Sequence, residues 1–315
     1  MHLLDWFVLV SALSFVVLWS IRKSRQRSKG STMHDFVLSG REAQWYTVAI
    51  SVMATQASAI TFISLPGQAY VDGMRFVQSY LGLPLAMVIL CIVAIPMYHK
   101  LNVLTAYEFL EKRFDLKTRT LAASLFLLQR SLAAAISIYA PSIVLSIIMG
   151  WNVGYVIFVI GILVVLYTTS GGTRAVSWAQ SYQMAIITLG MVSVGFFVVY
   201  SLPQDVSFSD ALSVAAVSGK LNTIDFTFDL NNKYTFWSGL LGGLFLQLSY
   251  FGTDQSQVQR YLSGESVTQS RLGLLFNGMM KIPMQFGILF IGAMMFVFYQ
   301  FTAPPLFFNQ SEVEK

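Results

Sequence analysis

The stretch ATQASAITFISLPGQAY, residues 54–70, sets polar side chains and a proline-glycine pair inside an apolar run. Hydroxyls and small residues let membrane helices pack closely, so each polar residue taken alone is compatible with a packing role. Pro66 lacks a backbone N–H group and Gly67 disfavours a helix, so the second half of the stretch is predicted to be kinked or unwound. Carbonyl groups freed at membrane depth require a partner, and a small cation is the functional candidate.

The composition is typical of an integral membrane protein. Hydrophobic residues make up 55% of the 315 residues, charged residues only 11%, and the mean hydropathy is +0.63. The charges lie between apolar runs of about 20 residues, the length of a helix that crosses a bilayer. A single cysteine excludes a disulfide within the chain. We predict eight spanning helices, at residues 4–21, 44–70, 76–98, 119–149, 152–169, 175–201, 234–258 and 272–300.

Lysine and arginine residues fill alternate loops, and this asymmetry decides the predicted orientation. Positively charged loops stay on the cytoplasmic side of a membrane. The same asymmetry explains the net charge of +5 without a nucleic acid. The amino terminus is therefore predicted outside the cell, in a multi-pass protein of the plasma membrane. The residues that set this orientation are Arg22, Lys23, Arg25, Arg27, Lys29, Arg41, Lys100, Lys112, Arg113, Lys117, Arg119, Arg174, Arg260 and Arg271.

A second segment repeats the polar interruption. The sequence SGLLGGLFLQLSYFGTDQSQVQR, residues 238–260, begins with glycines and ends its apolar run at Asp254. Interrupted spans at corresponding places in two halves are the best sequence indicator of a transporter binding site. We therefore predict two inverted repeats whose interrupted helices face each other. The predicted divisions are an outer helix and basic loop at 1–43, a five-helix repeat at 44–201, an extracellular loop at 202–233 and the start of the second repeat at 234–315.

Three motifs, ATQASAITFISLPGQAYVDG, YTTSGGTRAVSWAQSYQ and SYFGTDQSQVQRYLSG, resemble those of the solute:sodium symporter family. This family includes the sodium/glucose, monocarboxylate, multivitamin and iodide cotransporters, and the chain resembles a bacterial-type member. Its first motif is more similar to the vitamin, monocarboxylate and sialic-acid members than to the sugar members. The resemblance implies an all-α, leucine-transporter-type fold, with an outer helix before five plus five inverted-repeat helices. The eight spans would be the outer helix and core helices one to seven, the N-terminal part of such a protein.

The resemblance also implies a site for a co-transported sodium ion. By position, the backbone carbonyls of Ala54 and Ala57 would bind the ion, and the remaining ligands, serines on a later helix, are expected beyond Lys315. Many members carry an aspartate where this chain has Gln180. A neutral amide cannot supply the same charge, which puts a second sodium site in doubt.

Six residues are candidates for contact with the solute, by their positions in the family. Thr61 and Tyr80 stand where the sugar transporters use a glutamine and a glutamate, so recognition of a galactose-like sugar is in doubt. The other candidates are Tyr250 at an aromatic gate position, Asp254 and Gln255 at a polar pair, and Lys281 at a lysine of the eighth span.

Two cations fall inside predicted spans, Arg130 in LFLLQRSLAAA and Lys281 in GMMKIPM. Ionisable groups at such depth usually face a cavity or a partner. For Lys281 we expect a polar contact near the solute or a charge pair with Asp254, with a structural pair or a side chain that snorkels to the interface as the alternatives. Arg130 is compatible with a structural role, satisfied by neighbouring polar side chains and carbonyl groups.

These features predict a secondary active transporter and not an enzyme. The expected activity is sodium-coupled symport of a small organic solute, such as a sugar, an organic anion or a vitamin-like molecule, into the cell by alternating access. The three histidines are isolated, so a metalloprotease pattern is missing. The alternatives are a proton-coupled transporter of the same fold, with Asp254 as the proton carrier, and a solute sensor that does not transport. The oligomeric state stays open.

Overall fold

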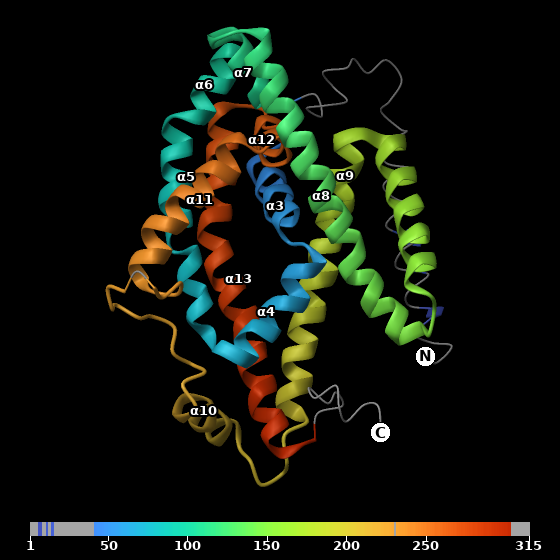
Figure 1. The fold of residues 1–315 in the computed structure, drawn as a ribbon, viewed down its shortest axis with the longest axis vertical. Coiled ribbons are helices and arrows are strands. Elements are labelled where there is room, and N and C mark those ends of the chain that lie inside the picture. Colours follow the sequence, from blue (N-terminus) through green and yellow to red (C-terminus); the bar gives the residue numbers. More distant parts are fainter. Residues whose placement is uncertain (1–5, 8–10, 12–13, 16–40, 230, 304–315) are drawn as a thin grey trace.

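The computed structural model describes residues 6, 7, 11, 14, 15, 41–229 and 231–303, and their regular structure is helical (Figure 1). The predicted first span therefore lies mostly outside the described residues. The helices that position the site are α3 (Trp45–Gln56), α4 (Ala59–Asp72), η2 (Met74–Tyr80), α5 (Gly82–Ile92), α6 (Ala94–Leu101), α7 (Ala106–Arg113), α8 (Leu116–Met149), α9 (Val153–Tyr200), α10 (Phe208–Val217), η3 (Ser238–Gly242), α11 (Gly243–Thr253), α12 (Gln255–Leu262) and α13 (Val267–Phe301).

The span predicted at 44–70 is broken, but at a different residue from the one predicted. Its two halves, α3 and α4, meet at an angle of 62°. The break lies at Ala57 and Ser58, whereas Pro66 and Gly67 lie inside α4. Ser58 has an extended backbone and its side chain accepts a hydrogen bond from the Thr61 N–H group, so it caps a new helix. Pro66 removes one N–H donor without ending that helix, which membrane helices tolerate.

The two ends of the molecule differ in charge. Figure 1 shows α6, α7 and α12 at one end and α10 at the other, with α9 folding back between its two arms. The end formed by α6, α7 and the start of α8 has an excess of basic residues, and α10 with the loops around it has an excess of acidic ones. The first end carries Lys100, Lys112, Arg113, Lys117 and Arg119 against Glu108, Glu111 and Asp115, and the second carries Asp205, Asp210, Asp225 and Asp229 against Lys220 and Lys233.

Four described helical segments are long and apolar enough to cross a membrane, and a fifth is added if the bent pair α3–α4 counts as one span. The four are Met74–Leu101, Leu116–Met149, Ala179–Tyr200 and Val267–Phe301. The span predicted at 152–169 corresponds to the shorter apolar arm Val153–Leu166 of α9. The span predicted at 234–258 is divided among η3, α11 and α12, so none of its pieces has the length of a full crossing.

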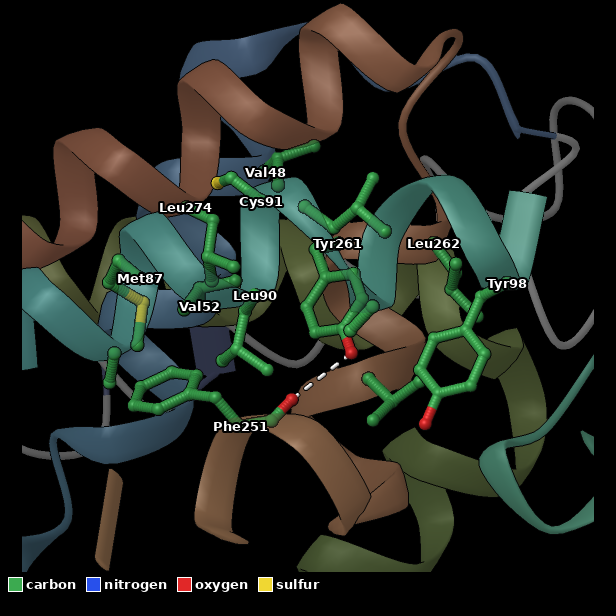
Figure 2. Packing of buried hydrophobic residues seen from close by; sticks show 14 of the residues in the cluster. Val48, Val52, Met87, Leu90, Cys91, Tyr98, Phe251, Tyr261, Leu262 and Leu274 are labelled. Carbon is green, nitrogen blue, oxygen red and sulfur yellow. Dashed lines mark hydrogen bonds between the residues drawn. The ribbon is translucent and has the colours of Figure 1, made fainter. Parts of the chain in front are cut away.

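The main core lies between α3, α5, α11, α12 and α13. Figure 2 shows Tyr261 at its centre, where the hydroxyl donates to the Phe251 carbonyl at 3.1 Å. The Tyr98 hydroxyl likewise donates to the Gly252 carbonyl at 2.8 Å. Both tyrosines are buried and satisfy carbonyls near the end of α11. The core therefore fixes the place where α11 gives way to α12.

Large apolar side chains also cover the outer surface of α8 and α9. Leu125, Leu128 and Leu132 on α8 and Phe196 on α9 are all exposed. Such a continuous exposed apolar surface is unfavourable in water and suits contact with lipid.

Two glycines allow close helix approaches. At Gly292 of α13, an added Cβ atom would lie 2.2 Å from the Pro66 carbonyl oxygen of α4. At Gly239 of η3, it would lie 2.0 Å from the Gln78 carbonyl oxygen of η2. Small residues at helix contacts are the usual device for close packing in membranes. The broken pair α3–α4 is consequently held tightly against α13.

Candidate functional site

The bend between α3 and α4 contains both residues predicted to bind sodium. The Ala57 N–H group donates to the Met53 carbonyl at 3.1 Å and to the Ala54 carbonyl at 3.2 Å, and the chain then becomes extended. The Ala54 carbonyl already accepts one hydrogen bond, so a cation would use its second lone pair. Thr61 lies in the first turn of α4, with its hydroxyl 3.3 Å from the Ser58 hydroxyl.

The helix that packs against this bend, α13, presents a buried polar stripe formed by Asn277, Lys281 and Gln285. These residues are four positions apart and therefore share one face of the helix. Asn277 and Gln285 are completely buried, and Lys281 is 2% exposed. Neither polar atom of Asn277 or of Gln285 has a hydrogen-bond partner in the described part of the chain. Each buried polar group left unsatisfied costs about 1–3 kcal/mol, so the stripe weakens the fold.

Tyr80, at the end of η2, faces the same stripe. The Lys281 ammonium nitrogen lies 5.9 Å from the centre of the Tyr80 ring, at cation–π distance. The Tyr80 hydroxyl faces the Gln285 amide without regular hydrogen-bond geometry and lies within electrostatic range of Tyr250. The Tyr250 hydroxyl accepts a hydrogen bond from the Gln257 amide at 2.8 Å. Tyr80 and Lys281 therefore meet beside the middle of α13, with Tyr250 nearby.

Asp254 lies at the junction between α11 and α12, where its partner is Arg130 and not Lys281. One Asp254 oxygen is 3.7 Å from an Arg130 guanidinium nitrogen, and the other accepts from the Ser256 N–H group at 2.9 Å. Arg130 also donates to the Ser256 hydroxyl. The expected charge pair between Lys281 and Asp254 is therefore wrong. Arg130 reaches across from α8, a pairing that its sequence neighbours could not indicate.

Gln255 is bound by the backbone before α7 and at its start. Its side chain accepts from the Ala106 N–H group at 2.9 Å and donates to the Leu104 carbonyl at 3.1 Å. Burial raises the pKa of Tyr107 to about 12, and its hydroxyl donates to the Thr253 carbonyl at 3.1 Å. Both contacts join α7 to the α11–α12 junction. We call this set of contacts, made by Arg130, Asp254, Gln255, Ser256 and Tyr107, the junction cluster.

A third polar group joins α3 to α9. The Thr55 hydroxyl lies 3.2 Å from the Gln180 amide nitrogen, and the Ser51 hydroxyl lies 3.3 Å from the Ser177 hydroxyl. The Arg260 guanidinium donates to the same Ser177 hydroxyl at 3.2 Å. The group thus contains a neutral amide, three hydroxyls and a guanidinium, and the absence of a second sodium site here stays a prediction.

The structure thus divides the predicted site residues. It brings Tyr80 and Lys281 together, keeps Thr61 with Ala54 and Ala57 at the bend, and sets Asp254 and Gln255 in the junction cluster. Sequence reasoning missed Asn277 and Gln285. The signal that could have found them is their four-residue spacing on either side of Lys281 within one apolar span.

Comparisons with known proteins identify the family of the chain. Residues 36–308 match the model of the sodium:solute symporter family. The human sodium/iodide cotransporter is 30% identical over 92% of this chain and 44% of its own length. The human sodium-coupled monocarboxylate transporter 1 is 33% identical over 78% of this chain and 40% of its own length. This chain thus spans about two fifths of the length of the curated relatives it matches.

A solved structure extends the comparison to the fold. A sodium-coupled sialic acid symporter, in a substrate-bound outward-open state, superposes with a TM-score of 0.85 and 26% identity over 98% of this chain and 64% of its own. The expected all-α, leucine-transporter-type architecture is therefore confirmed. With the matched motifs, the broken helix and this shared fold, the chain belongs to the sodium:solute symporter family.

Proposed function

We propose that the protein takes part in sodium-coupled symport of a small organic solute, a sugar, an organic anion or a vitamin-like molecule, into the cell. The observation that carries this proposal is the bent pair α3–α4, packed against a helix whose buried face holds unsatisfied polar groups. This polar face lies between apolar helices that suit a membrane. The names of the relatives support sodium as the coupling ion.

Sodium binding at the bend would be the first step of the cycle. The carbonyls of Ala54 and Ala57 are the proposed ligands, because α3 ends at Gln56 and Ala57 already departs from helical geometry. The solute would then bind near Thr61, Tyr80 and Lys281. Moving one positive charge inward across 100 mV supplies about 2.3 kcal/mol, which is available to drive the solute against its own gradient.

The junction cluster would close the path at the end that carries α6 and α7. Its ion pair and its Gln255 contacts tie α8 and α7 to α11–α12, so these contacts must separate before a solute can leave at that end. The family position of Asp254 and Gln255 suggests direct solute contact, but their own partners favour this closing role. Tyr250, which is bonded to Gln257, would lie between the solute and the closure.

The orientation and the divisions of the chain follow from the charge distribution. We propose that the basic end faces the cytoplasm and that the amino terminus lies outside the cell. The loop at 202–233 would then be extracellular, between the repeat at 44–201 and the repeat that begins at 234, after the outer helix and basic loop at 1–43. Labelling of the variants Ser209→Cys and Lys117→Cys with a membrane-impermeant thiol reagent, added to intact cells, would test this orientation, because only the cysteine outside the cell reacts.

The decisive experiment is uptake into proteoliposomes under imposed gradients. The purified protein would be supplied with a panel of labelled sugars, carboxylates and vitamins, under an inward gradient of sodium or of choline. Accumulation that requires the sodium gradient supports the proposal. Accumulation that follows a pH gradient and ignores sodium supports the proton-coupled alternative, and sodium binding without any uptake supports the sensor.

A further inference from the structure

Residues 224–228, in the segment before η3, expose their apolar side chains, while their polar side chains are bonded within the protein. The sequence IDFTF alternates apolar and polar residues, and successive side chains of an extended chain point to opposite sides. Ile224, Phe226 and Phe228 are 51%, 66% and 73% exposed. The Asp225 side chain between them is only 16% exposed. A segment surrounded by water would be expected to show the opposite pattern.

Hydrogen bonds hold this segment against the helices, so the exposure of its apolar side chains belongs to the fold. The Asp225 N–H group donates to the side-chain oxygen of the completely buried Gln78 at 2.9 Å. The Asp225 carboxylate lies 3.6 Å from an Arg75 guanidinium nitrogen and accepts from the Thr227 hydroxyl at 2.7 Å. Its carbonyl accepts from the Phe236 N–H group at 2.7 Å. The polar side of the segment therefore faces the protein and its apolar side faces outward.

These contacts also fix the depth of the segment. Arg75 and Gln78 lie at the start of the span Met74–Leu101, which is long and apolar enough to cross a membrane. The Trp237 indole N–H group donates to the Phe226 carbonyl at 3.3 Å, directly before η3 begins. Tryptophan side chains are enriched where a membrane meets water. The segment consequently lies level with the end of a span, at the depth of the lipid headgroups.

The exposed apolar surface continues from this segment along η3 and α11. Trp237, Leu241 and Phe245 follow one another at intervals of four residues, so they share one face of the helix. They are all exposed. A surface that extends from the end of a span along a membrane helix is suited to lipid over its whole length.

We propose that Ile224, Phe226 and Phe228 insert into the lipid interface, where headgroups meet acyl chains, and hold the start of η3 at a fixed depth in the membrane. These side chains have no polar atoms, so they gain free energy when they leave water. The backbone groups known to be bonded there are the Asp225 N–H and carbonyl, the Phe226 carbonyl and the Thr227 N–H. Insertion therefore leaves these groups without an unpaired bond in lipid.

A lipid interface fits this surface better than a protein partner does. A stable protein interface uses about 20 residues on each side, whereas the segment offers three side chains beside Trp237. Gln78 also donates to the Tyr234 carbonyl at 3.0 Å, so it joins η2 to both ends of this segment. The anchor would thus fix the starts of two spans, at η2 and at η3, relative to the bilayer.

Spin labels at single cysteines test the proposal. Cys91 is the one cysteine of the sequence and is buried, so Cys91→Ala gives a background without thiols. Labels at Phe226→Cys and Phe228→Cys would be compared with one at Val217→Cys, a strongly exposed position on α10. In phosphatidylcholine vesicles, collisions with oxygen report lipid and collisions with a soluble nickel chelate report water. We expect an oxygen-to-nickel ratio about threefold higher at both positions than at Val217.

The other outcomes overturn the lipid anchor. Equal ratios at Phe226, Phe228 and Val217 would mean that the segment lies in water. Low accessibility to both reagents would mean that protein covers it, and spin–spin broadening would identify that protein as a second copy of the chain. A label at Thr227→Cys should have a lower ratio than its two neighbours, and the same oxygen preference at all three positions would contradict the proposed orientation.

Photolabelling of the native protein decides the question without any substitution. Trypsin cleaves after Lys220 and Lys233, so residues 221–233 are released as one peptide that contains the three side chains. A lipid-soluble diazirine, activated by light in the same vesicles, should modify this peptide. Residues 261–271, released by cleavage after Arg260 and Arg271, are the control from the opposite end of the molecule and should stay unmodified. Mass spectra without adducts on residues 221–233 would overturn the proposal.

Discussion

The junction cluster and the stripe on α13 are both polar regions inside a membrane protein, but within the described part of the chain only the junction cluster finds its hydrogen-bond partners. In the junction cluster, Asp254 is paired with Arg130 and Gln255 is bonded twice to the backbone near α7. In the stripe, Asn277 and Gln285 have no partner for either polar atom among the residues that the structure describes. The first arrangement stabilises one closed structure, and the second costs stability until a ligand supplies the missing bonds.

The first prediction concerns the close packing of α13 against α4, which holds the unfavourable stripe in place. It has the largest expected effect on stability. Gly292→Ala would force a Cβ atom to within 2.2 Å of the Pro66 carbonyl oxygen, so α13 would have to move away from α4. We expect a loss of about 3 kcal/mol in stability and a lower midpoint in thermal unfolding. Gly287→Ala is the matched control, because an added Cβ there meets nothing within 4 Å. Equal midpoints for the two variants would refute the packing argument.

The second prediction concerns the satisfied region. Asp254→Ala removes the ion pair to Arg130 and the bond from the Ser256 N–H group, and we expect a loss of about 1.5–3 kcal/mol. Arg130→Met should cost a similar amount. The double variant should cost less than the sum of the two, because the residues contact one another. Thermal unfolding of the four proteins gives this coupling, and strictly additive losses would mean that the pair contributes nothing.

The third prediction compares one glutamine from each region directly. Gln285→Met replaces an unsatisfied amide with an apolar group of similar size, so it should raise stability by about 1 kcal/mol while weakening solute binding. Gln255→Met removes two hydrogen bonds to the α7 region and should lower stability by about 1 kcal/mol. Thermal unfolding without solute measures both changes. Losses of the same sign and size would show that the two regions do not differ as described.

These two regions also show which features of the protein could be predicted from its sequence and which could not. Composition and apolar run lengths predict the membrane class, and the polar stretch at 54–70 predicts a broken helix, because both depend on local chemistry. The position of the break was predicted wrongly, because Pro66 indicated a kink, whereas the Ser58 side chain caps a new helix and Pro66 is accommodated inside it. The pairing of Arg130 with Asp254 joins helices far apart in sequence, and a single sequence carries no signal for it.

The last prediction, with the smallest expected effect, concerns Glu108 on α7, which lies beside the junction cluster. It is tested through the pH dependence of stability. Glu108 lies on α7, outside the spans, and its carboxylate accepts from the Leu104 N–H group at 2.8 Å, beside the carbonyl that bonds Gln255. Burial raises the pKa of Glu108, but the hydrogen bond from Leu104 and the ammonium group of Lys112 outweigh it, so the pKa lies below its usual value. A depressed pKa in the folded state stabilises the protein above the unfolded-state pKa of about 4.3, and this stabilisation is lost as pH falls through the folded value. Glu108→Gln should therefore lower the free energy of unfolding by a few tenths of a kcal/mol at pH 7. The variant should also lose less stability than the native protein between pH 6 and the lowest pH at which the protein stays folded. Glu265→Gln, on the loop before α13, is the control for a general change in charge. An unchanged pH profile in Glu108→Gln would mean that the junction cluster keeps its structure without this carboxylate, and that its stability comes from Asp254 and Gln255 alone.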